Sequence, residues 1–274
     1  MTAAKPKTWL ARLLLALLMT VTLLPFLSMF TAALAPSGSY PNGLSWPADP
    51  QWSNFARAFE AANMGQLVLS STLIVLGVVP VSVLAATMAG YGLAKLTGGR
   101  NRWIYLVFVA GLTLPFEAVI TPLYYEVRAF GLLNTRFAII LPLIGLYMPF
   151  SVYWMRAHFL NVPNDLTEAA QLDGATRWKE FWLVQVPLAR PAIMSLTILL
   201  FLWTWNQFLL PVVLVKDPSR RTMAGALGAF QGQWGTDVPL LCAGSLLILA
   251  PTVLLFLAFQ RHFVAALLQG SVKG

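Results

Sequence analysis

The sequence predicts an all-α membrane protein with six transmembrane helices, on three observations. Hydrophobic residues make up 58% of the 274 residues and charged residues only 10%, where a soluble domain carries about 25% charged residues. Six apolar stretches along the chain are each long enough to cross a bilayer as a helix, which takes about 20 residues. Lys and Arg gather mainly at the ends of these stretches, as membrane topology requires.

Composition also excludes several classes of function. The net charge of +8 would suggest a nucleic-acid partner in a soluble protein, but here the charges flank apolar stretches, so we expect none. Cys242 is the single cysteine and lies within an apolar stretch, which leaves no disulfide framework. His158 and His262 are far apart in the sequence, and a metal site needs several converging ligands. We therefore expect this chain to bind neither a metal nor a cofactor.

The first apolar stretch, residues 13–34, follows three basic residues and contains no charge. A signal peptide is the alternative, because Ala33-Leu34-Ala35 resembles a cleavage site. The apolar core of a signal peptide has about 7–15 residues, however, whereas this stretch would span roughly 33 Å as a helix. We predict an uncleaved first span.

Five further spans follow in order. They lie at about residues 67–91, 103–125, 137–157, 192–215 and 238–260. Before the second span, residues 35–60 form a loop of turn residues and a short amphipathic piece. Ala86 and Gly90 in the second span form a small-xxx-small pair that lets another helix approach closely. A loop rich in Gly and Gln, residues 216–237, links the last two spans.

The basic residues orient these spans. Six spans put both termini on one side, and cytosolic termini place 12 of the 18 Lys and Arg residues in the cytosol and 6 outside. This excess follows the positive-inside rule, so we predict that both termini are cytosolic. Lys216, Arg220 and Arg221 form a local exception on the outer side.

The most charged stretch, residues 161–191, falls on the cytosolic side in this topology. Its local pattern is helix, stop, helix. Asn164 or Asp165 is placed to cap the first helix, and Gly174 is placed to take the left-handed position that ends it. Thr176 can cap the second helix.

This stretch resembles the EAA loop of ABC-importer permeases. The family pattern is Glu-Ala-Ala, three residues, Gly, nine residues, an aliphatic residue, one residue, another aliphatic residue and Pro. The matching residues are Glu168, Ala169, Ala170, Gly174, Val184, Val186 and Pro187. The two valines stand where the family usually has Ile and Leu. In that family the loop is a coupling helix that docks on an ATPase subunit. The resemblance thus implies ATPase coupling by Glu168, Ala169, Ala170, Asp173 and Gly174.

Other segments extend the resemblance over nearly the whole chain. Trp52-Ser53-Asn54-Phe55 resembles the external segment after the first span of carbohydrate-type permeases. Trp205-Asn206-Gln207-Phe208 resembles the Trp-Asn-(Asp/Glu)-Phe motif of their fifth span, with Gln207 where an acid is common. Gln260-Arg261, Phe263-Val264 and Gly270-Ser271-Val272-Lys273-Gly274 resemble their C-terminal end. The chain is similar to the maltose-transporter type of inner-membrane permease in a type I ABC importer.

The resemblance implies an assembly and a location. It implies one permease domain over residues 1–274, embedded in the lipid of a bacterial cell membrane. The implied partners are a second permease subunit in a heterodimer, two ATPase subunits that bind ATP and Mg, and an extracytoplasmic solute-binding protein. The 216–237 loop would reach toward the binding protein, with Gln231, Gln233 and Trp234 as contact candidates. The implied substrate is a sugar, an oligosaccharide or a related polyol.

The chain has no catalytic motif of its own. It contains no GxxxxGK[ST] phosphate loop, no HExxH and no GxSxG, so we expect a transport subunit rather than an enzyme, with ATP hydrolysed by partners. An ion-coupled secondary transporter is the alternative function. Its coupling group would be Glu117, the acid inside a predicted span.

Four residues of the fifth span are candidates for the substrate path. Asn206 and Gln207 are amides within an uncharged span, and Trp203 and Trp205 flank them. An aromatic face beside an amide suits a sugar, which stacks and forms hydrogen bonds. The alternative for these four residues is hydrogen bonding between helices and anchoring at the membrane interface.

Overall fold

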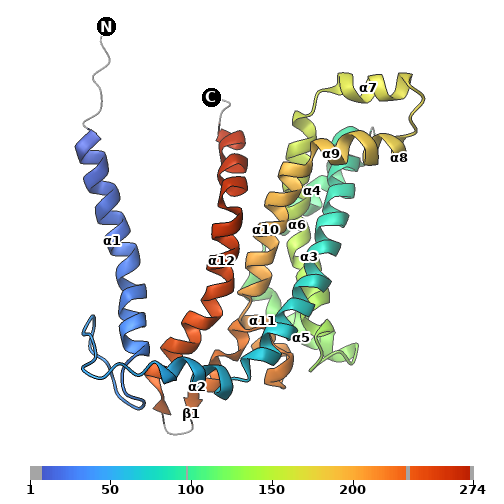
Figure 1. Cartoon of the computed structure of the whole chain (residues 1–274). Helices are drawn as coiled ribbons and strands as arrows, with labels where there is room; N and C mark the ends of the chain where they lie inside the picture. The colour runs from blue at the N-terminus through green and yellow to red at the C-terminus, as the bar shows by residue number, and fades with distance from the viewer. Residues whose placement is uncertain (1–7, 97, 233–234, 272–274) are drawn as a thin grey trace. The chain divides into compact units, whose positions relative to one another are not determined.

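The computed structural model describes residues 8–96, 98–232 and 235–271, most of them in helices (Figure 1). The contacts divide the chain into two compact units, and the single permease domain over residues 1–274 stays a prediction. The first unit holds the described residues up to Met64 and those from Leu227 to Pro251. The second unit holds Gly65–Ala226 and the described residues from Thr252 onward.

The described residues contain between four and six candidate spans. Four single helices are long and apolar enough to cross a membrane: Trp9–Ala33, Met64–Lys95, Phe137–Asn161 and Val238–Ala258. Two bent helix pairs would add one span each: Asn101–Gly111 with Phe116–Ala129, at 100°, and Arg177–Leu188 with Arg190–Trp205, at 73°.

Two of the predicted spans each cover a pair of helices rather than one. Residues 103–125 cover most of α4 (Asn101–Gly111) and most of α5 (Phe116–Ala129), with Pro115 at the N-cap of α5. Proline lacks an amide hydrogen and disfavours the helical conformation of the preceding residue, which accounts for the break. Residues 192–215 cover α10 (Arg190–Trp205) and α11 (Leu209–Leu214), which are separated by residues 206–208.

The first unit joins the end of the first helix to a short second helix. Its elements are α1 (Thr8–Ala33), α2 (Ser53–Ala61), the paired strands β1 (Gln231–Gly232) and β2 (Gly235–Thr236), and the first part of α12 (Val238–Ser271). The buried Asn54 side-chain amide donates to the carbonyl oxygens of Ala33 and Ala35 at 2.9 and 2.8 Å. The last carbonyls of a helix lack intrahelical partners, so Asn54 completes the end of α1. Phe30 of α1 packs against Phe55 of α2.

The second unit is built around α6 (Phe137–Asn161), which contacts α4, α5, α10 and α11. The other elements of this unit are α3 (Met64–Lys95), α7 (Asn164–Leu172), α8 (Arg177–Glu180), the π-helix η1 (Phe181–Gln185), α9 (Val186–Leu188) and the 3₁₀ turn η2 (Pro218–Arg220). A second 3₁₀ segment, η3 (Ala224–Phe230), crosses the boundary between the units.

Helices α3 and α6 approach closely at small residues. A Cβ atom added to Gly90 would lie 2.7 Å from the Cβ of Met155, closer than real contacts allow. Ala86, one turn earlier, is fully buried. The predicted role of Ala86 and Gly90 in a close helix contact is therefore confirmed.

Candidate functional site

The charged stretch between α6 and α10 folds back on itself. Helix α7 contacts both α8 and the π-helix η1. Figure 1 shows this folded stretch beyond the end of α6. The second predicted helix, from Arg177 onward, is one run interrupted by the π-helical turn rather than a regular α-helix.

The predicted stop between the two arms is confirmed. Gly174 has a φ angle of +77°. The Gly174 amide donates to the Gln171 carbonyl and the Ala175 amide to the Ala170 carbonyl, at 3.0 and 2.9 Å. These two bonds form the Schellman motif, which requires a left-handed residue after the helix. Thr176 then caps α8, as predicted, by accepting a hydrogen bond from the Lys179 amide.

The start of α7 differs from the prediction. The N-cap residue is Pro163, with no side-chain cap, so neither Asn164 nor Asp165 caps the helix. Instead, the Lys95 Nζ atom at the end of α3 donates to the Asn164 Oδ1 atom and to the Val162 carbonyl oxygen, each at 2.7 Å. A cation from another helix thus fixes the place where α7 begins, which the local pattern does not show.

Helix α7 presents the motif residues to solvent. Glu168, Ala169, Asp173 and Gly174 are exposed and Ala170 is half-buried. Residues three and four positions apart share a helix face, and Leu172 joins the face of Glu168 and Ala169. The Leu172 side chain is 89% exposed. Leu172 is not among the residues predicted from the motif, although it lies four positions after Glu168.

A neighbouring face of α7, which bears Thr167 and Gln171, meets a polar network around the buried Glu180 and Gln185. The Gln185 Nε2 atom donates to the Thr167 Oγ1 atom at 2.9 Å and to the Glu180 Oε1 atom at 3.2 Å. The Gln171 Nε2 atom donates to the Glu180 Oε2 atom at 3.3 Å. The network thus joins α7 to the end of α8 and the π-helix. None of these four residues was a sequence-based candidate, because their convergence depends on the folding back of the stretch.

The substrate-path candidates separate into exposed and buried groups. Trp203 is 40% exposed, and its ring contacts those of Phe150 and Tyr147 on α6 at 4.9 and 5.7 Å. Trp205 is buried and stacks on Phe201. Of the two tryptophans, Trp203 is therefore the one with an exposed side chain. Its neighbours Tyr147 and Phe150 belong to another helix, and their spacing in the sequence gives no signal of this contact.

The two amide candidates lie at the break between α10 and α11. The exposed Asn206 side chain donates to the Leu202 carbonyl at 2.9 Å and to the Thr252 Oγ1 atom at 3.4 Å. The Gln207 backbone carbonyl accepts from the Thr222 hydroxyl at 2.5 Å. The side-chain amide of Asn206 and the backbone carbonyl of Gln207 therefore contribute to the local structure of the break.

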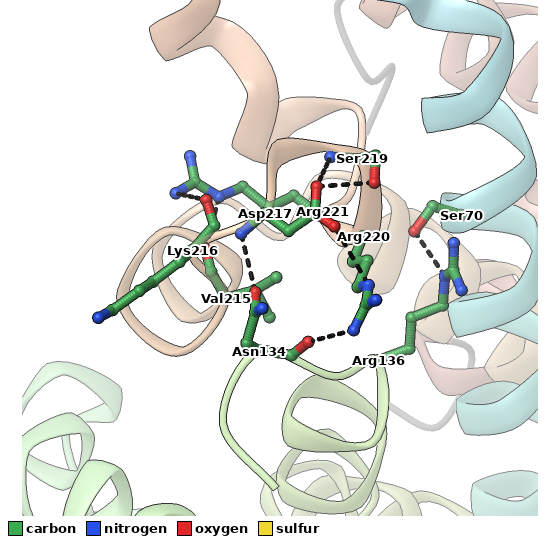
Figure 2. Close-up of polar contacts among 9 residues, drawn as sticks. All are labelled: Ser70, Asn134, Arg136, Val215, Lys216, Asp217, Ser219, Arg220 and Arg221. Carbon is green, nitrogen blue, oxygen red and sulfur yellow. Dashed lines mark hydrogen bonds and ion pairs between the residues drawn. The ribbon is translucent and has the colours of Figure 1, made fainter.

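The base of the 216–237 loop is held by a group of polar residues shown in Figure 2. Asn134, with a φ angle of +62°, accepts at its Oδ1 atom from the Asp217 amide at 2.8 Å. Its carbonyl oxygen accepts from the Arg220 Nη1 atom at 2.9 Å. Arg220 also pairs with the Asp217 carboxylate at 3.2 Å. These bonds attach the loop to the turn between α5 and α6.

Other cations of the same group bind neutral oxygens (Figure 2). The Arg221 guanidinium donates to the Val215 and Lys216 carbonyls, just past the end of α11, at 2.8 and 3.3 Å. The Arg136 Nε atom donates to the Ser70 hydroxyl at 2.9 Å. The arginines that run against the positive-inside rule here, Arg136, Arg220 and Arg221, therefore have structural partners.

Asp217 is the acid of this group. The Ser219 hydroxyl donates to its carboxylate at 2.7 Å and the Ser219 amide at 3.0 Å. Hydrogen bonds from the Ser219 hydroxyl and then the Ser219 amide, with Arg220 and Arg136 nearby, lower the pKa of Asp217 below its ordinary value. The carboxylate is therefore ionised at neutral pH.

The binding-protein contact candidates are only partly described. The Gln231 backbone lies in β1 and pairs with Thr236 of β2. Gln233 and Trp234 lie outside the described residues. Within the described part of the chain, no group of three His, Cys, Asp or Glu side chains converges on a metal site. Glu117 is exposed in the first turn of α5.

Residues 79–269 match the family model described as "Binding-protein-dependent transport system inner membrane component". The chain belongs to this family. It is a multi-pass membrane protein and the permease subunit of a binding-protein-dependent ABC importer. The permease is a transport subunit rather than an enzyme. This assignment replaces the ion-coupled alternative built on Glu117.

Several relatives are similar over nearly their whole length. The permease is 32% identical to the diacetylchitobiose uptake system permease protein NgcG of Streptomyces coelicolor, over 95% of this chain and 87% of the relative. It is 33% identical to the arabinooligosaccharides transport system permease protein AraQ of Halalkalibacterium halodurans, over 97% of both. It is 29% identical to the melibiose/raffinose/stachyose import permease protein MelC of Bacillus subtilis, over 100% of both.

The fold is also that of a known importer. A chain in the crystal structure of a bacterial ABC transporter for import of the acidic polysaccharide alginate has a TM-score of 0.81 to the permease. The comparison covers 96% of this chain and 100% of that chain, at 18% sequence identity. At this identity the similarity establishes the fold of the permease and not its substrate.

Proposed function

We propose that the permease forms half of a heterodimeric pathway for a carbohydrate, driven by two ATPase subunits that bind ATP and Mg. The observation that carries this proposal is the exposed motif face of α7. This face exposes the side chains of Glu168, Ala169 and Leu172. The helix itself is anchored to the ends of α3 and α6 by the hydrogen bonds of Lys95. Such a helix is suited to enter a groove on a partner.

The chemistry of this face fits an ATPase groove. Leu172 supplies an apolar anchor, and Ala169 leaves a smooth surface for close approach. Glu168 and Asp173 add negative charge at either end of the contact. Opening and closing of the ATPase pair would then move α7 and, with it, the spans to which it is attached.

The carbohydrate assignment rests on the relatives and on one aromatic face. NgcG, AraQ and MelC are described as permeases for oligosaccharides. Trp203 offers a partly exposed ring backed by Tyr147 and Phe150, and Asn206 lies within one turn of it with its amide exposed. Stacking on an aromatic ring with a nearby hydrogen-bonding amide suits a sugar ring.

The opposite end of the second unit is proposed to face the solute-binding protein. The bonds among Asn134, Asp217 and Arg220 support this role because they fix the base of the 216–237 loop. We place both termini and α7 in the cytosol of a bacterial cell and this loop outside. The excess of basic residues on the side of α7 supports this orientation.

A co-purification experiment tests the proposal. The tagged permease, expressed with the genes that flank its own, is purified in mild detergent and its partners are identified by mass spectrometry. Wild type is compared with a Glu168→Lys, Gly174→Trp double variant and with Lys179→Gln, a control at an exposed α8 residue outside the motif. We expect an ATPase with a phosphate loop in the wild type and the control, and its loss from the double variant.

Two results would count against the proposal. Absence of any ATPase from the wild-type complex would remove ATP-driven coupling. Retention of the ATPase by the double variant would remove α7 as its docking site. The co-purified or co-expressed binding protein, screened against oligosaccharides by thermal shift, tests the substrate class separately, and binding of amino acids or metal ions alone would contradict a carbohydrate.

A further inference from the structure

Glu180 lies in the 161–191 stretch but is not one of the motif residues. Its carboxylate is buried. Its side chain is 0% exposed, as is that of Gln185. A buried carboxylate is costly unless hydrogen bonds or charges compensate it. In the part of the chain that the structure describes, no Lys or Arg lies within ion-pair distance of Glu180. Its two oxygens accept from the amides of Gln171 and Gln185 instead.

The π-helical turn makes this arrangement possible. The Val186 amide bonds to the Phe181 carbonyl, five residues back, as π-helices require. In a regular α-helix, side chains three and four positions apart are neighbours. Here Glu180 and Gln185 are five apart and still share a hydrogen bond. Short π-helical turns recur at functional sites, and this one turns Gln185 toward both Glu180 and Thr167.

The network also borders the buried ends of two spans. Phe181, directly after Glu180, is 2% exposed. Its ring lies 5.1 Å from the Tyr91 ring of α3, which in turn lies 5.8 Å from the Phe159 ring of α6. The chain of contacts from α7 through the network to α3 and α6 is therefore continuous.

We propose that Glu180, with Gln171 and Gln185, is a latch that fixes α7 to the π-helical turn, so that the cytosolic stretch moves as one lever with the ends of α3 and α6. Without the latch, α7 remains attached at its start by the Lys95 hydrogen bonds and through its covalent links to α6 and α8. A docked ATPase would then move α7 alone. The second half of this inference rests on the proposed coupling function; the first half, the latch itself, does not.

Hydrogen–deuterium exchange of the purified permease in nanodiscs tests the latch without any partner. Glu180→Gln keeps the shape but turns an amide toward the Gln171 donor. We expect α7 amides to exchange at least about tenfold faster, because a hydrogen bond to a charged group is lost. Gln185→Leu should also speed the exchange of α7 amides, although Gln185 lies in η1 and not in α7. Lys179→Gln, exposed and outside the network, should leave exchange unchanged.

A reciprocal variant separates the latch from a general disturbance of the stretch. In Gln171→Glu combined with Glu180→Gln, the new carboxylate accepts from the new amide at residue 180. The side-chain oxygen of the glutamine at position 180 can still accept a hydrogen bond from Gln185. We expect the double variant to restore slow exchange of α7, because the hydrogen bond between residues 171 and 180 is formed again. If Glu180→Gln had simply unfolded the stretch, a second substitution would not restore slow exchange. Equal exchange in wild type and Glu180→Gln, or no rescue in the double variant, would overturn the latch.

The lever is tested in the reconstituted importer by counting solute transported per ATP hydrolysed. We expect Glu180→Gln to retain its ATPase subunits but to transport less solute per ATP, and the reciprocal variant to recover. Faster α7 exchange with an unchanged ratio would show a latch that transmits no motion, and would overturn the lever. Failure of wild type to bind any ATPase would instead overturn the proposed function, whatever the exchange data show.

Discussion

At Gly174 the backbone conformation, rather than the space around it, limits which residues are tolerated. Its φ angle is +77°, and an added Cβ would meet nothing within 4 Å. A residue with a Cβ costs about 1–2 kcal/mol in the left-handed region, and asparagine tolerates it better. We expect Gly174→Val to lower the amount of ATPase that co-purifies, and Gly174→Asn to lower it less. Equal losses in the two variants would contradict a conformational cause.

Asp217 makes the stability of the loop base depend on pH, with stability lost at low pH. Its pKa is lowered in the folded protein, so its stabilisation is complete above the unfolded pKa of about 3.9 and is lost as pH falls through the folded value. We expect amide protection in residues 214–222, corrected for intrinsic exchange, to hold from neutral pH down to about pH 4 and then fall. Asp217→Asn should remove this pH dependence. A loss of protection near pH 6 in wild type would point to a different group.

Local sequence patterns predict the structural role of a residue well when that role depends only on its neighbours in the chain. Gly174 and Thr176 are placed correctly because a left-handed stop and a hydroxyl cap depend only on adjacent residues. Asn164 was expected to cap α7 and instead accepts from Lys95, which is distant in sequence. Glu180 reads as an ordinary surface acid in the sequence. Its burial follows from the folding back of two helices, which no local pattern encodes.

The contact between helices α3 and α6 depends on the absence of a side chain at Gly90. A Cβ at Gly90 would lie 2.7 Å from the Met155 Cβ and 2.8 Å from the Arg156 backbone nitrogen. We expect Gly90→Ala to lower the free energy of unfolding by about 1–3 kcal/mol, because the helices must separate.

The matched control for this contact is Gly145→Ala on α6. Nothing lies within 4 Å of a Cβ added to Gly145, and alanine is favoured over glycine within a helix by roughly 0.5–1 kcal/mol. This variant should therefore be neutral or stabilising. Thermal unfolding of the two purified variants in the same detergent measures the difference. Similar melting temperatures would mean that α3 and α6 do not depend on the contact.

Helix boundaries were predictable where charge and composition change together, and less so within apolar stretches. The start of α6 coincides with that of the predicted span, because Arg136 precedes it, whereas the helix continues past residue 157 to Asn161. The break between α4 and α5 lies inside an uninterrupted apolar stretch, where hydropathy alone gives no signal. Pro115 was the available signal. Between α10 and α11 the signal was Pro211, which has no amide hydrogen to donate to the Gln207 carbonyl four residues earlier. That carbonyl accepts from the Thr222 hydroxyl instead.

For the whole molecule, the orientation in the membrane connects the proposed sites with their partners. Figure 1 shows α8 and α11 at opposite ends of the second unit's long helices. If α7 and α8 are cytosolic, the loop that begins at Lys216 lies outside, as an importer with an external binding protein requires. The basic group at this loop runs against the general charge bias. Its bonds to Asn134, Val215 and Ser70 give it a structural reason to be there.

Cysteine labelling in intact cells measures this orientation directly. Cys242 is the single cysteine, so Cys242→Ser provides a background without thiols. Single Lys216→Cys and Lys179→Cys variants then report on the two ends, since both lysines are exposed. A membrane-impermeant maleimide, given access to the outer face of the inner membrane, should label Lys216→Cys in intact cells and Lys179→Cys only after permeabilisation. The reverse pattern would place α7 outside, beyond the reach of any cytosolic ATPase, and both the lever and the proposed function would fall together.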